Sequence, residues 1–152
     1  MPTYYFDTSA LVKLYVVEPG TNAVLALTKD LNRHALAVAD LARVEFRAAI
    51  RRRERAGDIS SETVREKLAD LEGHLRSIFL IQPLSALVLD EACAILDRHP
   101  LRAYDAVQLA ACVMLAPLVP KPPIVFVCSD RELLSAAGAE GLKTLDPEAR
   151  ST

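Results

Sequence analysis

The sequence predicts an α/β domain with a mostly parallel central sheet, and three observations support this fold class. Short β-prone runs alternate with longer helical patterns along the chain, as expected for β-α-β units. Residues 124–128 are continuously apolar, which is typical of a strand buried on both faces. The length of 152 residues, 51% of them hydrophobic, suits one core, so we expect a single domain over residues 1–152.

The first part of the chain predicts two strands and two short helices. Residues 3–6 form a β-prone run that ends at Asp7. A helical pattern follows, and it ends at residues 18–20, which include Pro19 and Gly20. Residues 21–31 predict another short helix, and residues 34–38 a second strand.

Caps and helix breakers mark the ends of the later elements. Asp40 can cap a helix over residues 41–55, which Gly57 ends. Prolines between residues 117 and 123 predict a loop that cannot be helical. Ser129 and Glu132 fit a capping box for the last helix, which glycines end. The remaining expected elements are helices over residues 60–78, 86–97, 103–115 and 129–137, and strands over residues 79–82, 124–128 and 142–145.

Composition narrows the function classes. The formal net charge is −2, so a nucleic-acid role must depend on local basic patches and bound cations. Cys93, Cys112 and Cys128 are widely spaced in apolar segments, which indicates buried thiols in a reducing cytosol and no zinc site. No signal peptide is visible, and the longest apolar stretches fall short of a membrane span. We therefore expect a cytoplasmic protein without a membrane partner.

Four carboxylates stand out by position. Asp7 and Asp130 follow expected strands, where ligands of open parallel sheets bind. Glu45 lies mid-helix among apolar neighbours, and Asp105 begins an Ala-rich helix with apolar residues on either side. Convergence of these acids would raise their pKa values, and a divalent cation would remove the repulsion. All-oxygen ligands suit Mg²⁺ or Mn²⁺, and such a site suits phosphodiester hydrolysis.

Each acid also has a structural interpretation. Asp7 is placed to cap the first helix, and Asp130 and Asp105 are acids at helix N-termini. Glu45 has no capping role in mid-helix, but a buried Arg is a candidate partner for it. Position alone leaves these alternatives open.

Four segments resemble, in order, the acidic motifs of PIN-domain ribonucleases, in particular the VapC toxins of bacterial toxin–antitoxin modules. Each segment carries one of the four acids, and together they span nearly the whole chain. The segments are residues 6–13, 41–49, 101–110 and 125–142.

The resemblance implies a three-layer α/β/α fold around the parallel sheet. It also implies that Asp7, Glu45, Asp105 and Asp130 bind Mg²⁺ or Mn²⁺ and activate water for hydrolysis of RNA. Ser9 resembles the hydroxyl that orients the metal site, with a helix cap as its alternative role. In the family a Thr or Ser often stands two residues before the last acid, whereas this chain has Cys128 there, so we expect a less well oriented Asp130.

The resemblance further implies a homodimer, an RNA substrate and a cognate antitoxin whose C-terminal segment covers the active-site groove. Alternatives are a solitary PIN nuclease in RNA processing, or a catalytically silent α/β binding module, which four intact acids disfavour. Ser9 disfavours a haloacid-dehalogenase-type phosphatase, which needs a second acid at that position. A receiver domain would need paired N-terminal acids and a late Lys after a strand, and neither is seen.

The sequence leaves the roles of two basic features open. The Arg-rich run of residues 51–55 fits either contacts to RNA phosphates or a solvated helix end. Arg102 is placed to reach a phosphate or to neutralise Asp105.

Overall fold

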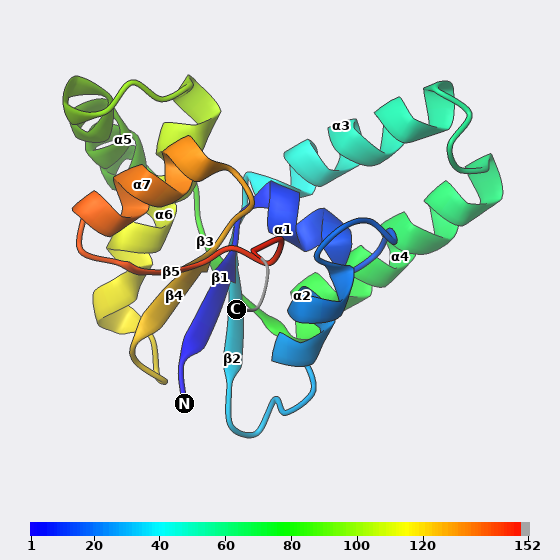
Figure 1. Cartoon of the computed structure of the whole chain (residues 1–152), viewed down its shortest axis with the longest axis horizontal. Coiled ribbons are helices and arrows are strands. Elements are labelled where there is room, and N and C mark those ends of the chain that lie inside the picture. The colour runs from blue at the N-terminus through cyan, green and yellow to red at the C-terminus, as the bar shows by residue number, and fades with distance from the viewer. Residues whose placement is uncertain (150–152) are drawn as a thin grey trace.

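A five-stranded, entirely parallel sheet forms the centre of the molecule (Figure 1). The structure is a computed structural model, and it describes residues 1–149. The strand order is β3-β2-β1-β4-β5, so the first strand of the chain lies in the middle. The strands are β1 Thr3–Phe6, β2 Ala35–Ala39, β3 Phe79–Gln82, β4 Ile124–Val127 and β5 Lys143–Leu145. The predicted α/β class and parallel sheet are confirmed.

Helices cover both faces of this sheet, which confirms the three-layer α/β/α arrangement (Figure 1). Successive strand residues point to opposite faces. Accordingly, Tyr5 belongs to one buried cluster and Phe6 to the other. The Phe6 side carries α1 Thr8–Lys13, α2 Thr21–Leu27, α3 Ala42–Arg55 and α4 Ser61–Ser77. The Tyr5 side carries α5 Ala86–Arg98, α6 Ala103–Leu115 and α7 Arg131–Ala139.

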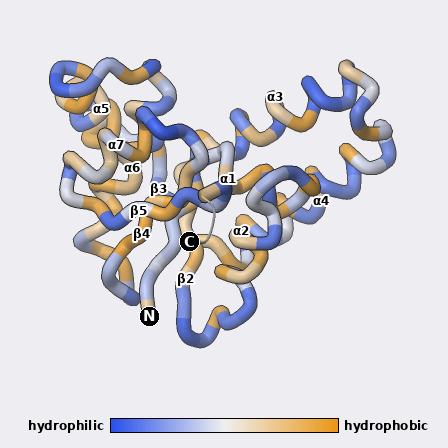
Figure 2. Tube along the Cα trace, in the orientation of Figure 1, coloured by the Kyte–Doolittle hydropathy of each residue, from blue (hydrophilic) through white to orange (hydrophobic). Residues whose placement is uncertain are grey.

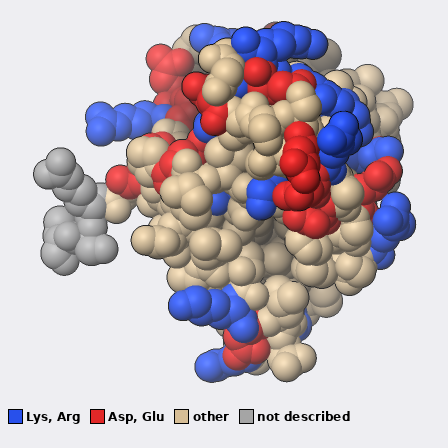
Figure 3. All heavy atoms as spheres, turned by 90° about the vertical axis from the view of Figure 1, so that its right-hand side faces the viewer, with Lys and Arg blue, Asp and Glu red and all other residues tan. Residues whose placement is uncertain are grey.

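The α3–α4 pair projects away from the sheet as a hairpin (Figure 1). Long hydrophilic stretches run along it, whereas the segments nearer the sheet are more apolar (Figure 2). At this end of the molecule, acidic and basic side chains lie interleaved, and neither sign dominates the face (Figure 3). This face therefore offers no uniformly basic patch to a polyanion.

Two predicted helix caps are wrong by one residue. Leu41, not Asp40, is the N-cap of α3, and it already has helical dihedral angles (φ −55°, ψ −30°). The Asp40 backbone N–H donates to Gln82 O on the neighbouring strand (2.9 Å), and the side chain accepts a bond from Arg43 Nη1 (3.4 Å). Asp130, not Ser129, caps α7, because Asp130 is the last residue with extended dihedral angles before the helix.

Three smaller expectations are also corrected. Helix α2 ends at Leu27, four residues early, where the Thr28 hydroxyl bonds back to Leu25 O (2.8 Å). The segment Ala116–Leu118 forms a short 3₁₀ helix, because a proline at its start needs no N–H partner. Cys93 is exposed, whereas Cys112 and Cys128 are buried as predicted, and all three are free thiols.

Within the described residues, no single helix has the length and apolar composition of a membrane span. The segments Ala86–Arg98 and Ala103–Leu118 reach that composition only as a pair, and they are bent by 117° at their junction.

Candidate active site

Asp7 lies at the carboxyl end of the central strand, held from two sides. Its backbone N–H donates to Val127 O at the end of β4 (3.2 Å). Its carboxylate Oδ1 accepts hydrogen bonds from Ser9 Oγ (2.7 Å) and from the backbone N–H of Ala10 (3.0 Å). Asp7 is therefore the N-cap of α1, as the structural interpretation of the sequence anticipated. Capping uses only one of its two oxygens in the described part of the chain.

The carboxylate of Asp7 is buried without a basic partner among residues 1–149. Its exposed fraction is 5%, and no Lys or Arg of the described chain forms an ion pair with it. Burial raises its pKa to about 6, while hydrogen bonds from Ser9, Ala10 and the Cys128 thiol lower the pKa and the charge of Asp105 raises it. An anion in this position favours a cation from outside the chain.

Glu45 lies where three helices meet. It is half-buried on α3, and its Oε1 accepts hydrogen bonds from Thr8 Oγ1 on α1 (3.0 Å) and from Gln108 Nε2 on α6 (2.7 Å). The predicted inward orientation is confirmed, but the predicted mid-helix position is wrong, because α3 begins at Ala42 and Glu45 lies in its first turn. The alternative partner, a buried Arg, is wrong for the described residues, because neutral donors hold this carboxylate.

Thr8, Gln108 and Tyr5 were not singled out by the sequence. Gln108 is 2% exposed, and its amide oxygen accepts a hydrogen bond from the buried Tyr5 hydroxyl (2.8 Å). Burial raises the pKa of Tyr5 well above its ordinary value, so this hydroxyl stays protonated. One signal was available: Gln108 is a polar residue in an apolar helix, three positions after Asp105 and so on the same side of it.

Asp105 and Asp130 are more open to solvent. Asp105 is half-buried in the first turn of α6, and its pKa is raised by that burial and then by the charges of Asp130 and Glu45. Arg102 lowers this pKa, but its described hydrogen bond goes to Tyr104 Oη (3.4 Å) and not to Asp105. Asp130 is exposed at the N-terminus of α7, where its Oδ1 accepts from Leu133 N–H (3.1 Å).

Cys128 takes part in this site through its sulfur. The Asp130 backbone N–H donates to Cys128 Sγ (3.2 Å), so the thiol holds the backbone of the loop before α7. The thiol is buried and its pKa is raised, first by burial and then by the charge of Asp7. The thiol contacts the backbone of Asp130, whereas the exposed carboxylate is held only by its cap.

Two serines join the loops that follow β1 and β4. Ser9 Oγ donates to Asp7 and accepts from the Ser129 backbone N–H (3.3 Å). Ser9 is not the cap of α1, because Asp7 has that position. Ser129 Oγ is buried and has no hydrogen-bond partner in the described chain, which leaves an uncommitted oxygen beside the carboxylates.

The four acids come from four segments that meet at the carboxyl edge of the sheet, and their charges act on one another. The donor set consists of carboxylates and hydroxyls, which suits Mg²⁺ or Mn²⁺ better than zinc. The four acids do not form a closed set of metal ligands, however. Among residues 1–149, no three His, Cys, Asp or Glu side chains lie close enough together to hold an ion.

A hollow of about 350 Å³ extends from this edge. It is lined by Thr8, Ser9 and Ser129 from the site, and by Lys13 and Arg52 from α1 and α3. The Lys13 ammonium is buried and paired with Glu18 Oε1 (2.9 Å). Glu18 and Glu148 also line the hollow and both pair with Lys13, so its surface carries charges of both signs.

The other arginines of the run at residues 51–55 are partly engaged. Arg51 pairs with Glu54 Oε1 (3.0 Å), and Arg53 pairs with Glu18. These ion pairs favour the solvated-helix interpretation for Arg51 and a structural role for Arg53.

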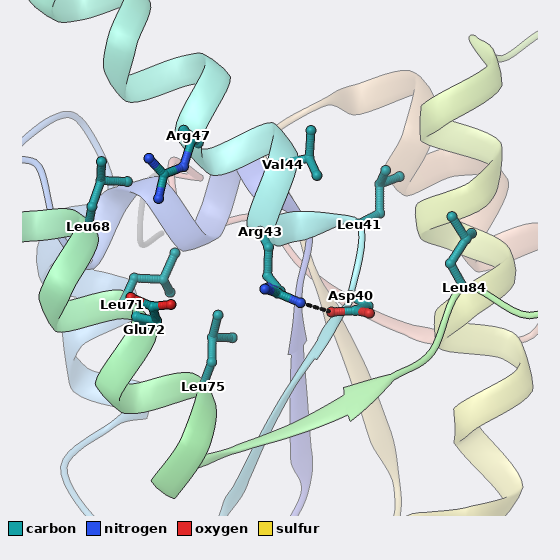
Figure 4. Close-up of a pocket in the computed structure, with 10 residues that line it drawn as sticks. All are labelled: Asp40, Leu41, Arg43, Val44, Arg47, Leu68, Leu71, Glu72, Leu75 and Leu84. Carbon is teal, nitrogen blue, oxygen red and sulfur yellow. Dashed lines mark hydrogen bonds and ion pairs between the residues drawn. The ribbon is translucent and has the colours of Figure 1, made fainter.

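A second hollow, of about 420 Å³, lies away from the carboxylates between α3 and α4 (Figure 4). Apolar side chains of both helices face it, and the Arg43–Asp40 pair lies at one end. It contains none of the predicted site residues, so size alone does not locate the site.

The chain is similar to known proteins over nearly its whole length. The PIN domain family model matches residues 4–115. Two curated relatives from Mycobacterium tuberculosis are Ribonuclease VapC45 (strain CDC 1551 / Oshkosh) and Ribonuclease VapC49 (strain ATCC 25618 / H37Rv). Each is 32% identical over 151 residues, which cover 97% of this chain and 100% of the relative.

Solved structures share the fold. PAE2754 from Pyrobaculum aerophilum aligns with a TM-score of 0.63 at 23% identity, over 97% of this chain and 90% of that one. VapBC2 from Rickettsia felis, bound to a DNA fragment from their promoter, gives 0.64 at 12% identity, over 95% and 98% of the two chains. A toxin–antitoxin complex from Klebsiella pneumoniae gives 0.63 at 14% identity, over 95% and 97%.

Proposed function

The chain belongs to the PIN domain family as a VapC-like member, and from this premise we propose that it is a metal-dependent endoribonuclease, the toxin of a toxin–antitoxin pair. The observation that carries the proposal is the buried Asp7 carboxylate at the carboxyl end of β1, which has no basic partner among the described residues. Residues 1–152 are proposed to form one nuclease domain.

Asp7, Glu45, Asp105 and Asp130 are proposed to hold Mg²⁺ or Mn²⁺. When bound, such an ion supplies positive charge that polarises the phosphate and acidifies an attacking water. The chain's own residues position the ligands. Ser9 and Ala10 fix one oxygen of Asp7, and Thr8 and Gln108 fix one oxygen of Glu45.

The proposed substrate is RNA, and Arg52 in the hollow next to Ser9 supports this. Arg52 is exposed and forms no ion pair among the described residues, so it is available to an RNA phosphate. Burial raises the pKa values of Asp7 and Asp105, and a bound cation would lower them and reverse the local repulsion of RNA.

The proposed partners are a cognate antitoxin and a second copy of the chain, in the cytoplasm. Solved neighbours that are toxin–antitoxin complexes support the antitoxin. They also favour a toxin over the alternative of a solitary PIN nuclease in RNA processing. An abutting open reading frame for a short protein would add support for the pair.

Cleavage of an RNA panel by the antitoxin-free protein tests the activity. We expect cleavage with Mg²⁺ or Mn²⁺, and none with excess chelator. Glu45→Gln should lower the rate by at least about 100-fold, because removal of outer ligand partners alone costs about 10–100-fold. Glu54→Gln, on the same helix but paired with Arg51, is the matched control and should cut normally.

An RNA panel that stays intact with either metal, or cleavage that survives chelation, would contradict the proposal. Equal rates for Glu45→Gln and wild type would remove Glu45 from the site. Only an RNA panel that stays intact would favour the silent binding module.

A further inference from the structure

A buried chain of hydrogen bonds runs from the central strand to Glu45. Tyr5 Oη on β1 donates to Gln108 Oε1 on α6 (2.8 Å), and Gln108 Nε2 donates to Glu45 Oε1 on α3 (2.7 Å). Tyr5 is 0% exposed and Gln108 is 2% exposed. Both are therefore shielded from water, and their polar groups depend on each other for partners.

The donor and acceptor properties of the three side chains fix the direction of these hydrogen bonds. A carboxylate accepts hydrogen bonds only, whereas an amide has a donor end and an acceptor end. Nε2 of Gln108 must therefore face Glu45, which turns Oε1 toward Tyr5. The Tyr5 hydroxyl is the donor to this oxygen (2.8 Å), and it also lies within hydrogen-bond distance of the Gln108 backbone oxygen (3.0 Å). A phenylalanine at position 5 would leave the amide oxygen without that donor.

Thr8 closes the network from the other side. Its Oγ1 accepts from Gln108 Nε2 (3.2 Å) and donates to Glu45 Oε1 (3.0 Å). Both donors to Glu45 thus meet the same oxygen. Within residues 1–149, Oε2 of Glu45 receives no hydrogen bond from the chain, so the network fixes the carboxylate and leaves one oxygen free for a ligand.

We propose that Gln108 is the positioning residue that holds Glu45 for metal binding, and that Tyr5 fixes the direction of the Gln108 amide. The inference rests on the proposed function and adds to it two residues that carry no charge. Partners of this kind behind metal-binding carboxylates change metal affinity by about 10–100-fold when removed.

Metal binding to the purified protein tests the proposal without any RNA. Gln108→Met keeps the length and bulk of the side chain but removes both polar groups. We expect its Mn²⁺ affinity, measured by titration calorimetry, to fall by about 10–100-fold. Tyr5→Phe should weaken binding in the same direction by less than about tenfold, because Gln108 and Thr8 still donate to Glu45.

Cys112→Ala is the matched control for packing. Cys112 is buried on the same helix, one turn after Gln108, and makes no hydrogen bond to Glu45 in the described chain. Its variant should lose stability in urea but keep wild-type Mn²⁺ affinity. If Cys112→Ala loses as much affinity as Gln108→Met, affinity follows general packing and the inference is wrong.

The side-chain amide of Gln108 gives a second, metal-independent readout. In ¹⁵N NMR its protons should exchange slowly with solvent, in contrast to those of Gln82, whose exposed bond to Pro83 O is long (3.4 Å). Tyr5→Phe should speed exchange at Gln108. This measurement also decides the question if Gln108→Met fails to fold.

The outcomes separate the two proposals. If the wild type binds Mn²⁺ and Gln108→Met binds it with an affinity within about twofold of the wild-type value, the positioning role is wrong. The proposed nuclease activity is not affected by that result. Rapid solvent exchange of the Gln108 side-chain amide protons would also show that the positioning role is wrong. A wild-type protein that binds no Mn²⁺ and cuts no RNA overturns the proposed function, and the positioning role with it.

Discussion

In the absence of divalent cations, the Asp7→Asn variant should be more stable than the wild type. Burial raises the pKa of Asp7 from 3.8 to about 6, so the folded chain binds this proton more tightly than the unfolded chain does. The shift of about two pH units corresponds to about 3 kcal/mol, at about 1.4 kcal/mol per unit. Because Asp7 is only 5% exposed, solvent screening reduces this figure little. Asparagine keeps an acceptor oxygen for Ser9 and Ala10 but carries no charge.

The sign of the pH dependence follows from the raised pKa. Protonated Asp7 favours the folded state, so the cost to the wild type is absent below pH 3.8, grows between pH 3.8 and about 6, and is complete above about pH 6. Urea unfolding followed by circular dichroism in chelator should show a gap of about 3 kcal/mol at pH 8 and about half of it at pH 5. The melting temperature should differ by about 6–12 °C at pH 8.

A metal ion should reverse this order. Mn²⁺ should stabilise the wild type and leave Asp7→Asn largely unchanged, and the variant should not cut RNA. Asp90→Asn is the control, because Asp90 is exposed on α5, and its stability should stay within about 0.5 kcal/mol of the wild type. Equal stabilities of Asp7→Asn and wild type at pH 8, or a gap that does not change with pH, would refute the reasoning.

Three further changes should alter stability in urea titrations. Gly138→Ala should add about 0.5–1 kcal/mol, because Gly138 lies inside α7 and no atom lies within 4 Å of the added Cβ; a loss of stability would contradict this. Gly20→Ala should lower the stability by more than about 1 kcal/mol, because φ is +91° and the new Cβ would lie 3.0 Å from Pro147 O. An unchanged stability would contradict this. Ser60→Ala should cost about 1 kcal/mol through loss of the 3.1 Å cap to Thr63 N–H, and Ser77→Ala, near the other end of α4, serves for comparison.

The sequence was sufficient to predict the sheet, because each strand is a local pattern. The apolar run at Ile124–Val127 and the alternation of strands with helices need no tertiary information. The order of the strands in the sheet is not a local property. Tyr4, for example, pairs with both Leu36 and Val125, which are distant in the sequence. Only packing decides that order.

Errors at helix caps have a local cause that composition does not reveal. Composition favours Asp40 as the cap of α3, but its backbone N–H bonds to Gln82 O on the neighbouring strand, and Leu41 directly precedes the helix. Ser129 and Asp130 are both good caps, and the extended dihedral angles of Asp130 (φ −88°, ψ 118°) select it.

The candidate site was predictable in its acids but not in their support. Asp7 and Glu45 stood out through their positions in the sequence, and the structure shows them buried or half-buried. Gln108 was missed because its partners, Glu45 and Tyr5, are 63 and 103 residues away. An amide in an apolar helix shows its role only once those partners are in place.

The position of β1 in the middle of the sheet has a consequence for biosynthesis. β1 cannot pair with β4 until the ribosome has synthesised residues Ile124–Val127, more than 100 residues later. The Asp7 backbone binds Val127 O, and Ser9 binds the N–H of Ser129, so neither contact exists in a shorter nascent chain. A chain that terminates before residue 124 therefore lacks the strand and the loop that hold Asp7 and Ser9 in the proposed site.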